Sequence, residues 1–440
     1  MARIYPFRAW RYNPSAVRLN DVVTQPHDQI SPAMQQAYYQ SSPYNVVRIT
    51  LGLPELFDAE RGESVYTRAA RDFRMWREEG VLAQEKDPCV FAYAQRFTAP
   101  GTERVQERRG FIALGKLYDY AEQVVFRHEQ TLQQSENDRL NLLQATRAHF
   151  EQIFMLYSDP ARTVEAILFD GSGAPDVEVT DEHDVTHRLW RVSDPATIRL
   201  LTTAMADKKL IIADGHDGYE TALNDARARG ASTRIRLEHS STRLPQPPYP
   251  EAAAMMTFVN MDADGLAILP THRVVRGLAG FDAKAFLQAA EEFFVIDLLR
   301  GQDAESLAAP LQQQNGTAFV AVTREGNYLL RAKPEAAAAL GAIPERLRQL
   351  DLTHLRVLVL ERLLGVGAEQ AAGQAGVRCV REAAEAVEQV RRGEGEIAFL
   401  TNPVTMEQVR EVAFAGDMMA PDSTDFYPRL LSGLAVYALE

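Results

Sequence analysis

The stretch that organises the chain is Leu210-Ile-Ile-Ala-Asp-Gly-His-Asp-Gly-Tyr-Glu-Thr-Ala-Leu223. Its apolar residues from Leu210 to Ala213 predict a buried strand, and the residues from Tyr219 onward show a helical pattern. Two glycines lie between them, and glycine permits positive φ and a close approach of the backbone to a ligand. The sequence therefore predicts a strand, a tight loop and a helix in succession.

The predicted loop at 214–218 places polar side chains at the N-terminal end of the predicted helix. The first N–H groups of a helix have no partner within the helix, and the helix dipole favours an anion there. The loop can therefore hold a phosphate, or it can place Asp214, His216 and Asp217 around a cation. The alternative is an ordinary strand-to-helix turn capped by Asp, because no strict phosphate-loop pattern is present.

The composition is that of an ordinary globular protein. The 440 residues are 46% hydrophobic and 24% charged, which is enough for a large core in two or three domains, or in two intimately joined ones. The formal net charge of −13 argues against nucleic acid as a partner, because a phosphate backbone would be repelled. Cys89 and Cys379 lie far apart, which fits a reducing compartment. We expect a cytoplasmic protein without a membrane segment, because neither a signal peptide nor an apolar run of about 20 residues is visible.

Strand and helix patterns alternate in the first part of the chain and predict an α/β fold. The elements before the loop are a strand at 153–157, a helix at 160–169, a strand at 187–192 and a helix from 195 to about 206. Helical patterns dominate after Gly277. We therefore expect an α/β domain at 1–276, which carries the ligand site, and a second α/β domain at 277–440, whose tail is a candidate to return to that site.

Charged residues also occur near the start of the chain. His27 and Asp28 lie in a predicted loop before a helix that begins at Ser31, and loops often present functional side chains. Arg48 lies inside a strand predicted at 46–51, so its charge must reach water, a carboxylate or a bound anion. For the loop, the alternative is a turn with incidental polar residues.

A helix predicted at 135–149 carries two arginines. Arg139 and Arg147 are eight residues apart, which places them on roughly one helix face. Together with His128 and Glu129, which precede the helix, they can bind an anionic ligand. The alternative is a solvated charged face with ion pairs to nearby acidic residues.

A His-Arg pair, His272-Arg273, interrupts an apolar strand predicted at 265–275. Burial of such a pair is costly unless it is partnered. Either a ligand or an acidic residue pairs with it, or the two residues are hydrogen-bonded inside the core.

The polar, proline-rich stretch at 231–250 is a linker or a lid over the neighbouring site.

Seven stretches together resemble a bacterial and archaeal family known as domain of unknown function 1015. These stretches are Pro26-His-Asp-Gln-Ile-Ser-Pro32, Ser42-Pro-Tyr-Asn-Val-Val-Arg48, His128-Glu-Gln-Thr131, Asp138-Arg139 with Ala145-Thr-Arg147, Ala213-Asp-Gly-His216 with Tyr219-Glu-Thr-Ala222, Leu269-Pro-Thr-His-Arg273, and Ser423-Thr424 with Phe426-Tyr-Pro428. The family's loop is in turn similar to the phosphate-binding loop of the ParB/sulfiredoxin-like fold, which includes free-serine kinases and nucleotide-binding segregation proteins. The resemblance implies a mixed α/β protein with a ParB/sulfiredoxin-like core, a large β insertion and a mainly helical C-terminal part.

The sequence departs from the family's usual pattern at two places. Asp217 and Gly218 stand where the family usually has His-Arg, which removes a bidentate phosphate contact and adds a negative charge. In the tail, Asp422 stands where the family usually has Lys. Either a divalent cation bridges Asp217 to the phosphates, or this member is a weak binder or inactive.

The resemblance implies a nucleotide-dependent small-molecule kinase of the serine-kinase type. Its cofactors would be ATP or ADP with Mg²⁺, and its substrate would be serine or a related hydroxy amino acid. Phosphoryl transfer needs phosphates held in line, neutralised charge and an oriented hydroxyl group. The candidate catalytic residues are Asp28, Glu129 and His216, with Asp28 or Glu129 as the base. The candidate metal ligands are Asp214 and Asp217. The candidate cofactor- or substrate-binding residues are Arg48, Arg139, Arg147, Asp214, Gly215, His216, Gly218, Tyr219 and Arg273.

Two other functions are compatible with the same polar residues. One is a regulatory protein that binds a nucleotide or amino acid without catalysis, and turnover separates it from the kinase. The other is a metal-dependent hydrolase, although no compact ligand motif such as HExxH is present. We predict that one cleft collects the candidate ligands of that hydrolase, which are His27, Asp28, His128, Asp214 and His216.

Overall fold

The computed structural model describes residues 2–56, 58–131, 133–230, 244–367 and 376–440. The chain forms two compact units. Unit 1 contains Met1–Arg127, Thr131–Ala267 and Pro428–Glu440, and unit 2 contains His128–Gln130 and Ile268–Tyr427. Both units combine helices with a sheet, so the predicted mixed α/β class is confirmed. The part of the expected linker or lid at 231–243 lies outside the described residues.

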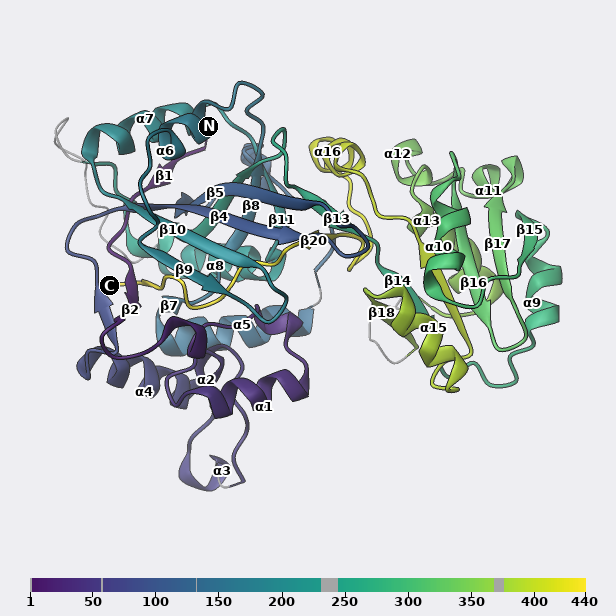
Figure 1. Cartoon of the computed structure of the whole chain (residues 1–440), viewed down its shortest axis with the longest axis horizontal. Helices are drawn as coiled ribbons and strands as arrows, with labels where there is room; N and C mark the ends of the chain where they lie inside the picture. Colours follow the sequence, from purple (N-terminus) through teal and green to yellow (C-terminus); the bar gives the residue numbers. More distant parts are fainter. Residues whose placement is uncertain (1, 57, 132, 231–243, 368–375) are drawn as a thin grey trace. The chain divides into compact units, whose positions relative to one another are not determined.

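A nine-stranded mixed sheet forms the centre of unit 1 (Figure 1). Its strands are β1 (Ile4–Tyr5), β4 (Val90–Thr98), β5 (Val105–Lys116), β6 (Val125–Phe126), β8 (Ile153–Tyr157), β9 (Val177–Thr180), β10 (Thr186–Val192), β11 (Leu210–Asp214) and β12 (Ala253–Asn260). Their order is β6-β11-β8-β12-β5-β4-β10-β9, and β1 pairs with β5. Strands β4 and β5 follow each other in the chain and pair antiparallel as a hairpin.

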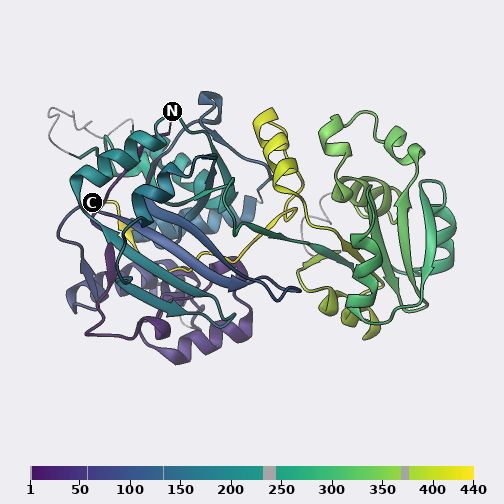
Figure 2. The same cartoon turned by 45° about the horizontal axis from the view of Figure 1, so that its top comes forward.

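Short helices and small strand pairs complete unit 1. The helices are α1 (Pro32–Ser41), α2 (Val47–Thr50), α3 (Asp58–Arg61), α4 (Val65–Glu78), α5 (Gln133–Thr146), α6 (Thr163–Phe169), α7 (Pro195–Met205) and α8 (His216–Gly230). The 3-10 turns are η1 (Leu19–Asp21), η2 (His27–Gln29), η3 (Tyr120–Glu122) and η4 (Pro250–Ala252). The paired short strands are β2 (Trp10–Tyr12) with β3 (Leu82–Gln84), and β7 (Ala148–His149) with β21 (Tyr437–Ala438). Helices α6 and α7 lie side by side in both views (Figure 1, Figure 2).

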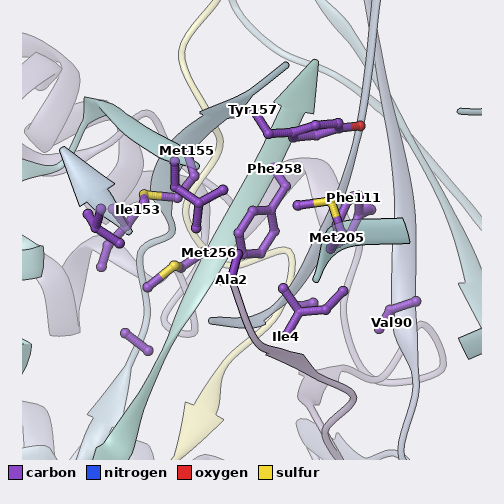
Figure 3. Packing of buried hydrophobic residues seen from close by; sticks show 14 of the residues in the cluster. Ala2, Ile4, Val90, Phe111, Ile153, Met155, Tyr157, Met205, Met256 and Phe258 are labelled. Carbon is purple, nitrogen blue, oxygen red and sulfur yellow. The ribbon is translucent and has the colours of Figure 1, made fainter. Parts of the chain in front are cut away.

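The main core of unit 1 lies on one face of this sheet (Figure 3). Side chains alternate along a strand, so Met155 of β8 and Met256 and Phe258 of β12 point to the same face. Met205 of α7 and Tyr219 of α8 belong to the same buried cluster. Each large apolar side chain buried in this way contributes about 1.5–3 kcal/mol. This packing holds both β11 and α8, and it therefore fixes the loop that joins them.

The central strand–loop–helix prediction is confirmed by β11 and α8, with Gly215 between them. The predicted helix start at Ser31 is also confirmed, because the Ser31 hydroxyl accepts a hydrogen bond from the N–H of Met34. The strand predicted at 46–51 is wrong, since these residues contain the helical turn α2. The side chain of Asn45 accepts a hydrogen bond from the N–H of Val47 (2.9 Å), and such local side-chain bonds favour a turn over the strand that the β-branched residues predict.

The helix predicted at 135–149 is α5, but its limits differ from the prediction. It begins at Gln133, two residues before the predicted start. It ends at Thr146, and Arg147 adopts a left-handed conformation with φ of 53°. Arg139 and Arg147 therefore do not share a helix face, and this expectation is wrong.

Unit 2 is built on a six-stranded antiparallel sheet of order β15-β17-β16-β19-β14-β18. The strands are β14 (His272–Val275), β15 (Phe294–Leu299), β16 (Ala318–Thr323), β17 (Asn327–Ala332), β18 (Val377–Val380) and β19 (Ile397–Thr401), and β13 (Ala267–Leu269) pairs separately with β20 (Asp425–Tyr427). The helices are α9 (Ala283–Ala290), α10 (Ala304–Gln312), α11 (Pro334–Ala339), α12 (Glu345–Arg348), α13 (Asp351–His354), the π-helix η5 (Leu355–Leu363), α15 (Ala383–Arg391) and α16 (Met406–Ala415). The described part of this unit thus contains a full sheet besides the helices that the sequence pattern predicts.

Candidate functional site

The loop between β11 and α8 is a tight turn that only glycine fits well. Gly215 has φ of 80°, and a Cβ atom at this position would lie 3.4 Å from the Cα atom of Ile153. Helix α8 begins at the next residue, and the N–H of Tyr219 bonds to the carbonyl of Gly215 (3.0 Å). The strand end, the glycine and the helix start are therefore pressed against β8, with His216 in the first turn.

Tyr219, in the first turn of α8, attaches this helix to the core of unit 1. Its side chain is fully buried, and its hydroxyl donates to the carbonyl of Tyr118 and accepts from the N–H of Tyr118, both at 2.9 Å. The sequence predicts a cofactor-binding role for Tyr219, and in the structure its hydroxyl bonds to Tyr118 and attaches α8 to the segment before η3.

Asp214 is the last residue of β11, and each of its two carboxylate oxygens has a partner. One carboxylate oxygen accepts from the N–H of Gly215 (2.9 Å), and the other forms an ion pair with Arg429. Burial raises the pKa of Asp214, but the ion pair and the hydrogen bonds outweigh burial and hold the pKa below its usual value. Asp214 is therefore a carboxylate over the whole physiological range.

Asp28 lies in the 3-10 turn η2, close to Asp214. Much of its surface remains open to solvent, but the protein around its carboxylate removes enough water to raise its pKa. The neighbouring charge of Asp214 raises this pKa further, while Arg429 and His27 lower it. Two adjacent carboxylates whose pKa values are pushed apart are a frequent arrangement of catalytic acids and bases.

Glu151 fixes the turn that carries Asp28. Its two carboxylate oxygens accept from the backbone N–H and from the ring Nδ1 of His27, each at 2.9 Å. Burial lowers the pKa of His27, but the charge and hydrogen bond of Glu151 outweigh burial and raise it. Burial would raise the pKa of Glu151, but the contacts with His27 and Arg139 lower it to about 2. Glu151 and His27 therefore form a charged pair at any pH that lies between the low pKa of Glu151 and the raised pKa of His27.

Arg139 extends this network through Glu151. It forms an ion pair with Asp138, approaches Glu151 at 3.5 Å, and donates to the carbonyl of Thr50 (3.0 Å). Its guanidinium is buried. The predicted anion-binding arginine is thus part of the scaffold that supports the His27 turn.

Two other predicted arginines have local structural partners. Arg48 donates to the carbonyl of Tyr39 (2.7 Å) and lies over the ring of Tyr39, 4.4 Å from its centroid. Arg147 forms ion pairs with Asp225 of α8 and with Glu251. Both arginines hold segments of unit 1 together at these contacts.

His128 and Glu129 belong to unit 2, together with Arg273. His128 Nε2 lies 2.8 Å from the Thr424 hydroxyl, and Glu129 accepts from the N–H of Thr424 (2.7 Å). Arg273 donates to the carbonyls of Thr271 (2.8 Å) and Asp422 (2.9 Å). These contacts agree with the alternative in which the residue is hydrogen-bonded inside the core.

Four of the five residues predicted to share a cleft lie together in unit 1, namely His27, Asp28, Asp214 and His216.

A family model described as "Protein of unknown function (DUF1015)" matches residues 4–353. The chain belongs to this family. The matched range includes every stretch quoted for the resemblance except the tail stretch at 423–428. No curated protein matches the sequence of this DUF1015 protein.

Several solved structures are similar to this DUF1015 protein in overall course. A free serine kinase in complex with AMP is 12% identical, with 69% of this chain and 83% of that chain covered and a TM-score of 0.34. A conserved hypothetical protein from Pyrococcus furiosus is also 12% identical, with 69% and 87% covered and a TM-score of 0.34. C-terminally truncated SbnI from Staphylococcus aureus is 8% identical, with 73% and 85% covered and a TM-score of 0.35.

Sequence reasoning did not identify two residues of the site in this DUF1015 protein. Glu151 is a single acidic residue before the apolar strand β8, and Arg429 directly follows the tail stretch that ends at Pro428. Only Arg429 could have been found from the sequence, because it adjoins a motif that resembles the family's tail. Within the described residues, no cluster of three or more His, Cys, Asp or Glu side chains is arranged to hold a metal ion, and no helix is both long and apolar enough to span a membrane.

Proposed function

We propose that this protein is a nucleotide-dependent phosphotransferase that acts on the hydroxyl group of a small molecule. One observation carries the proposal: Asp28, whose pKa is raised, lies beside Asp214 at the N-terminal end of α8. Phosphoryl transfer to a hydroxyl needs a group that accepts the hydroxyl proton and a site that holds the phosphates, and a helix N-terminus can hold phosphates. Serine or a related hydroxy amino acid is the proposed substrate, because the loop is similar to that of free-serine kinases.

The first turn of α8 would receive the phosphates. Its backbone N–H groups and the helix dipole favour negative charge. At Gly218 the nearest atom to an added Cβ would be Cγ1 of Ile153, at 3.7 Å, so a side chain could be built there without a clash. The glycine instead leaves the helix backbone open to a ligand at this point. Arg429, paired with Asp214, adds positive charge at the same end.

Asp28 would act as the general base. In the transfer step the substrate hydroxyl gives its proton to the Asp28 carboxylate, while its oxygen forms the new bond to the terminal phosphorus of the nucleotide. The bond from that phosphorus to the bridging oxygen breaks, and ADP leaves from ATP, or AMP from ADP. A general base works best when its pKa is close to the operating pH, and the raised pKa of Asp28 moves it in that direction. The Glu151–His27 pair holds the turn that presents Asp28.

A bound Mg²⁺ ion would neutralise charge on the phosphates and on the transferred group. Mg²⁺ usually binds through one or two carboxylates together with substrate phosphates, so a complete protein cage is not required. Asp217, in the first turn of α8, is the carboxylate that fits this role. Asp214 would have to give up part of its contact with Arg429 to coordinate the ion.

A second candidate function is nucleotide binding without turnover, and Asp217 is the feature that favours it. Its carboxylate adds a negative charge to the helix turn that would hold the phosphates. Such a charge about 4 Å from a phosphate costs several kcal/mol at intermediate dielectric unless a cation bridges the two. The same site would then serve as a regulatory sensor.

The test is phosphoryl transfer followed by ³¹P NMR, with ATP or ADP, Mg²⁺ and a panel of hydroxy amino acids. The proposal expects a phosphomonoester product with the native protein and a loss of about 100-fold or more in rate for Asp28→Asn. Nucleotide binding without product for every acceptor would favour the sensor. Absence of both binding and transfer would exclude both functions.

A further inference from the structure

We infer that strand β15 of unit 2 is an interface at which two copies of this chain pair edge to edge. The strand is the first in the sheet order β15-β17-β16-β19-β14-β18, and among the described strands none pairs with its other edge (Figure 1). An open edge of a sheet presents unpaired N–H and C=O groups and is a template for a further strand. This surface lies in unit 2 and is independent of the proposed function.

The pairing of β15 with β17 decides which of its backbone groups remain open. The carbonyl of Phe293 accepts a hydrogen bond from the N–H of Lys333 (2.8 Å), in the same register that continues along the two strands. Bonded and non-bonded pairs alternate along an antiparallel ladder, so the odd-numbered residues of β15 bond to β17. The N–H and C=O groups of Ile296 and Leu298 therefore point to the open edge, where no described residue bonds to them.

The side chains beside this edge are largely apolar. Leu298 is 65% exposed and Val295 is 42% exposed. The one charged residue of the strand, Asp297, forms an ion pair with Arg331 of β17 (2.6 Å). Lysine and proline, which commonly protect open edges from pairing, do not occur between 294 and 299. The strand therefore lacks the usual protection of an edge that stays unpaired.

A second copy of the chain fits this edge, because two identical antiparallel strands can satisfy each other's backbone groups about a twofold axis. An axis at Ile296 would need the outward groups of Phe294, which is completely buried. An axis at Asp297 would set two carboxylates directly opposite each other, which is unfavourable. An axis at Leu298 avoids both problems. It places the two exposed Leu298 side chains against each other and each Asp297 opposite Leu299 of the second copy.

Sedimentation velocity of the full chain over a series of concentrations tests this pairing. The variant Leu298→Lys would place two ammonium groups together at the axis. The matched control is Leu200→Lys on α7 of unit 1, where the leucine is 61% exposed. We expect the average mass of the native protein to rise from one chain towards two. Leu298→Lys should weaken this self-association by about 10-fold or more, because like charges are opposed, and Leu200→Lys should behave as the native protein does.

A cysteine cross-link tests the register and does not depend on the lysine variant. The two Cα atoms of a hydrogen-bonded antiparallel pair lie about 5.5 Å apart, which suits a disulfide. Mild oxidation should therefore join two chains of Leu298→Cys. In the same register the two copies of residue 295 lie about 20 Å apart along the strands, so Val295→Cys should not cross-link. The unaltered protein, with Cys89 and Cys379, is oxidised in parallel as the baseline.

A native protein that remains a single chain at every concentration would overturn the inference, and the open edge would then be left to a partner of another kind. Equal self-association of the native protein and Leu298→Lys would also overturn it, because the contact would lie on another surface. Cross-linking of Val295→Cys as readily as Leu298→Cys would contradict pairing about Leu298. Loss of self-association in Leu298→Lys alone, together with a cross-link in Leu298→Cys alone, is the expected result.

Discussion

At the scale of single residues, the contact that best explains the site is the one between His27 and Glu151. Glu151 binds both the backbone N–H and the ring of His27, so it fixes the turn as well as the charge. The side chains of His27 and Glu151 are 23% and 22% exposed, so solvent screens this pair only in part. Asp28, the next residue, owes its place beside Asp214 to this contact.

Glu151→Gln should destabilise the protein in a pH-dependent way. The raised pKa of His27 adds stability below its unfolded value of about 6.5, and this is lost as pH rises through the folded value. The lowered pKa of Glu151 adds stability above its unfolded value of about 4.3, which is lost towards pH 2. We expect a loss of about 2 kcal/mol near pH 5.5 and a smaller loss at pH 9.

Urea denaturation at the two pH values measures this effect. The matched control is Glu178→Gln, which breaks the more exposed pair of Glu178 with Arg188 (2.6 Å) and should change stability by about 0.5 kcal/mol or less. A loss for Glu151→Gln that is equal at pH 5.5 and pH 9 would show that the charge of His27 does not contribute.

The double variant Asp217→His with Gly218→Arg restores the pattern that is usual in the family. The structure accepts it, because a Cβ at Gly218 would be in ordinary contact with Ile153 (3.7 Å) and the residue does not have positive φ. An added arginine in the first turn of α8 supplies a bidentate phosphate contact, and the removed carboxylate no longer repels the ligand. Calorimetric titration of ATP should show tighter binding and a weaker dependence on Mg²⁺ than the native protein shows. Native binding that is equally strong without metal would mean that Asp217 faces away from the phosphates.

At the scale of elements, the strand–loop–helix unit was predictable because its signals are local. The apolar run of β11, the glycine in the turn and the apolar stripe of α8 all lie within one short segment. The turn α2 was not predictable from its β-branched residues, since it depends on the hydrogen bond from the N–H of Val47 to the Asn45 side chain and on burial of Val47 and Ile49. Short elements follow such tertiary contacts more than their own pattern.

Gly215→Ala should separate loop geometry from general stability. An alanine at φ of 80° is strained by about 1–2 kcal/mol, and its Cβ would lie in close contact with the backbone of Ile153, at 3.4 Å. Gly416→Ala is the matched control, because Gly416 has φ of 76°, ends α16 in unit 2, and has no atom within 4 Å of an added Cβ. Both variants should lower the melting temperature, but only Gly215→Ala should weaken nucleotide binding. Equal binding by the two variants would show that the loop does not contact the ligand.

At the scale of the whole molecule, the site in unit 1 is assembled from parts that are distant in sequence. Asp28, Glu151, Asp214 and Arg429 come from four separate segments, and the last of them follows a long excursion through unit 2. The sequence supported Asp28 and Asp214 because each lies in a recognisable motif. It could not predict that Glu151 binds His27 or that Arg429 binds Asp214, because these pairings depend on long-range packing.

The two units should respond differently to a nucleotide. Each has its own buried core, centred on residues such as Met256 in unit 1 and Val320 in unit 2. A ligand that binds only the folded structure stabilises it by RT ln(1 + L/Kd), where L is the free ligand concentration. Hydrogen-exchange mass spectrometry should show that ADP with Mg²⁺ protects β11, α8 and the turn η2 much more than β16 and β19. Stronger protection in unit 2 would place the nucleotide there and contradict the assignment of the site.

The central claim is that a nucleotide binds at the start of α8 beside Asp28, and isothermal titration calorimetry tests it most directly. ATP and ADP, each with Mg²⁺, are titrated into the native protein, Asp28→Asn and Gly215→Ala. We predict saturable binding to the native protein, binding to Asp28→Asn that is at least as tight because a negative charge is removed, and much weaker binding to Gly215→Ala. The absence of binding to folded native protein, or equal binding to native protein and Gly215→Ala, would contradict the claim.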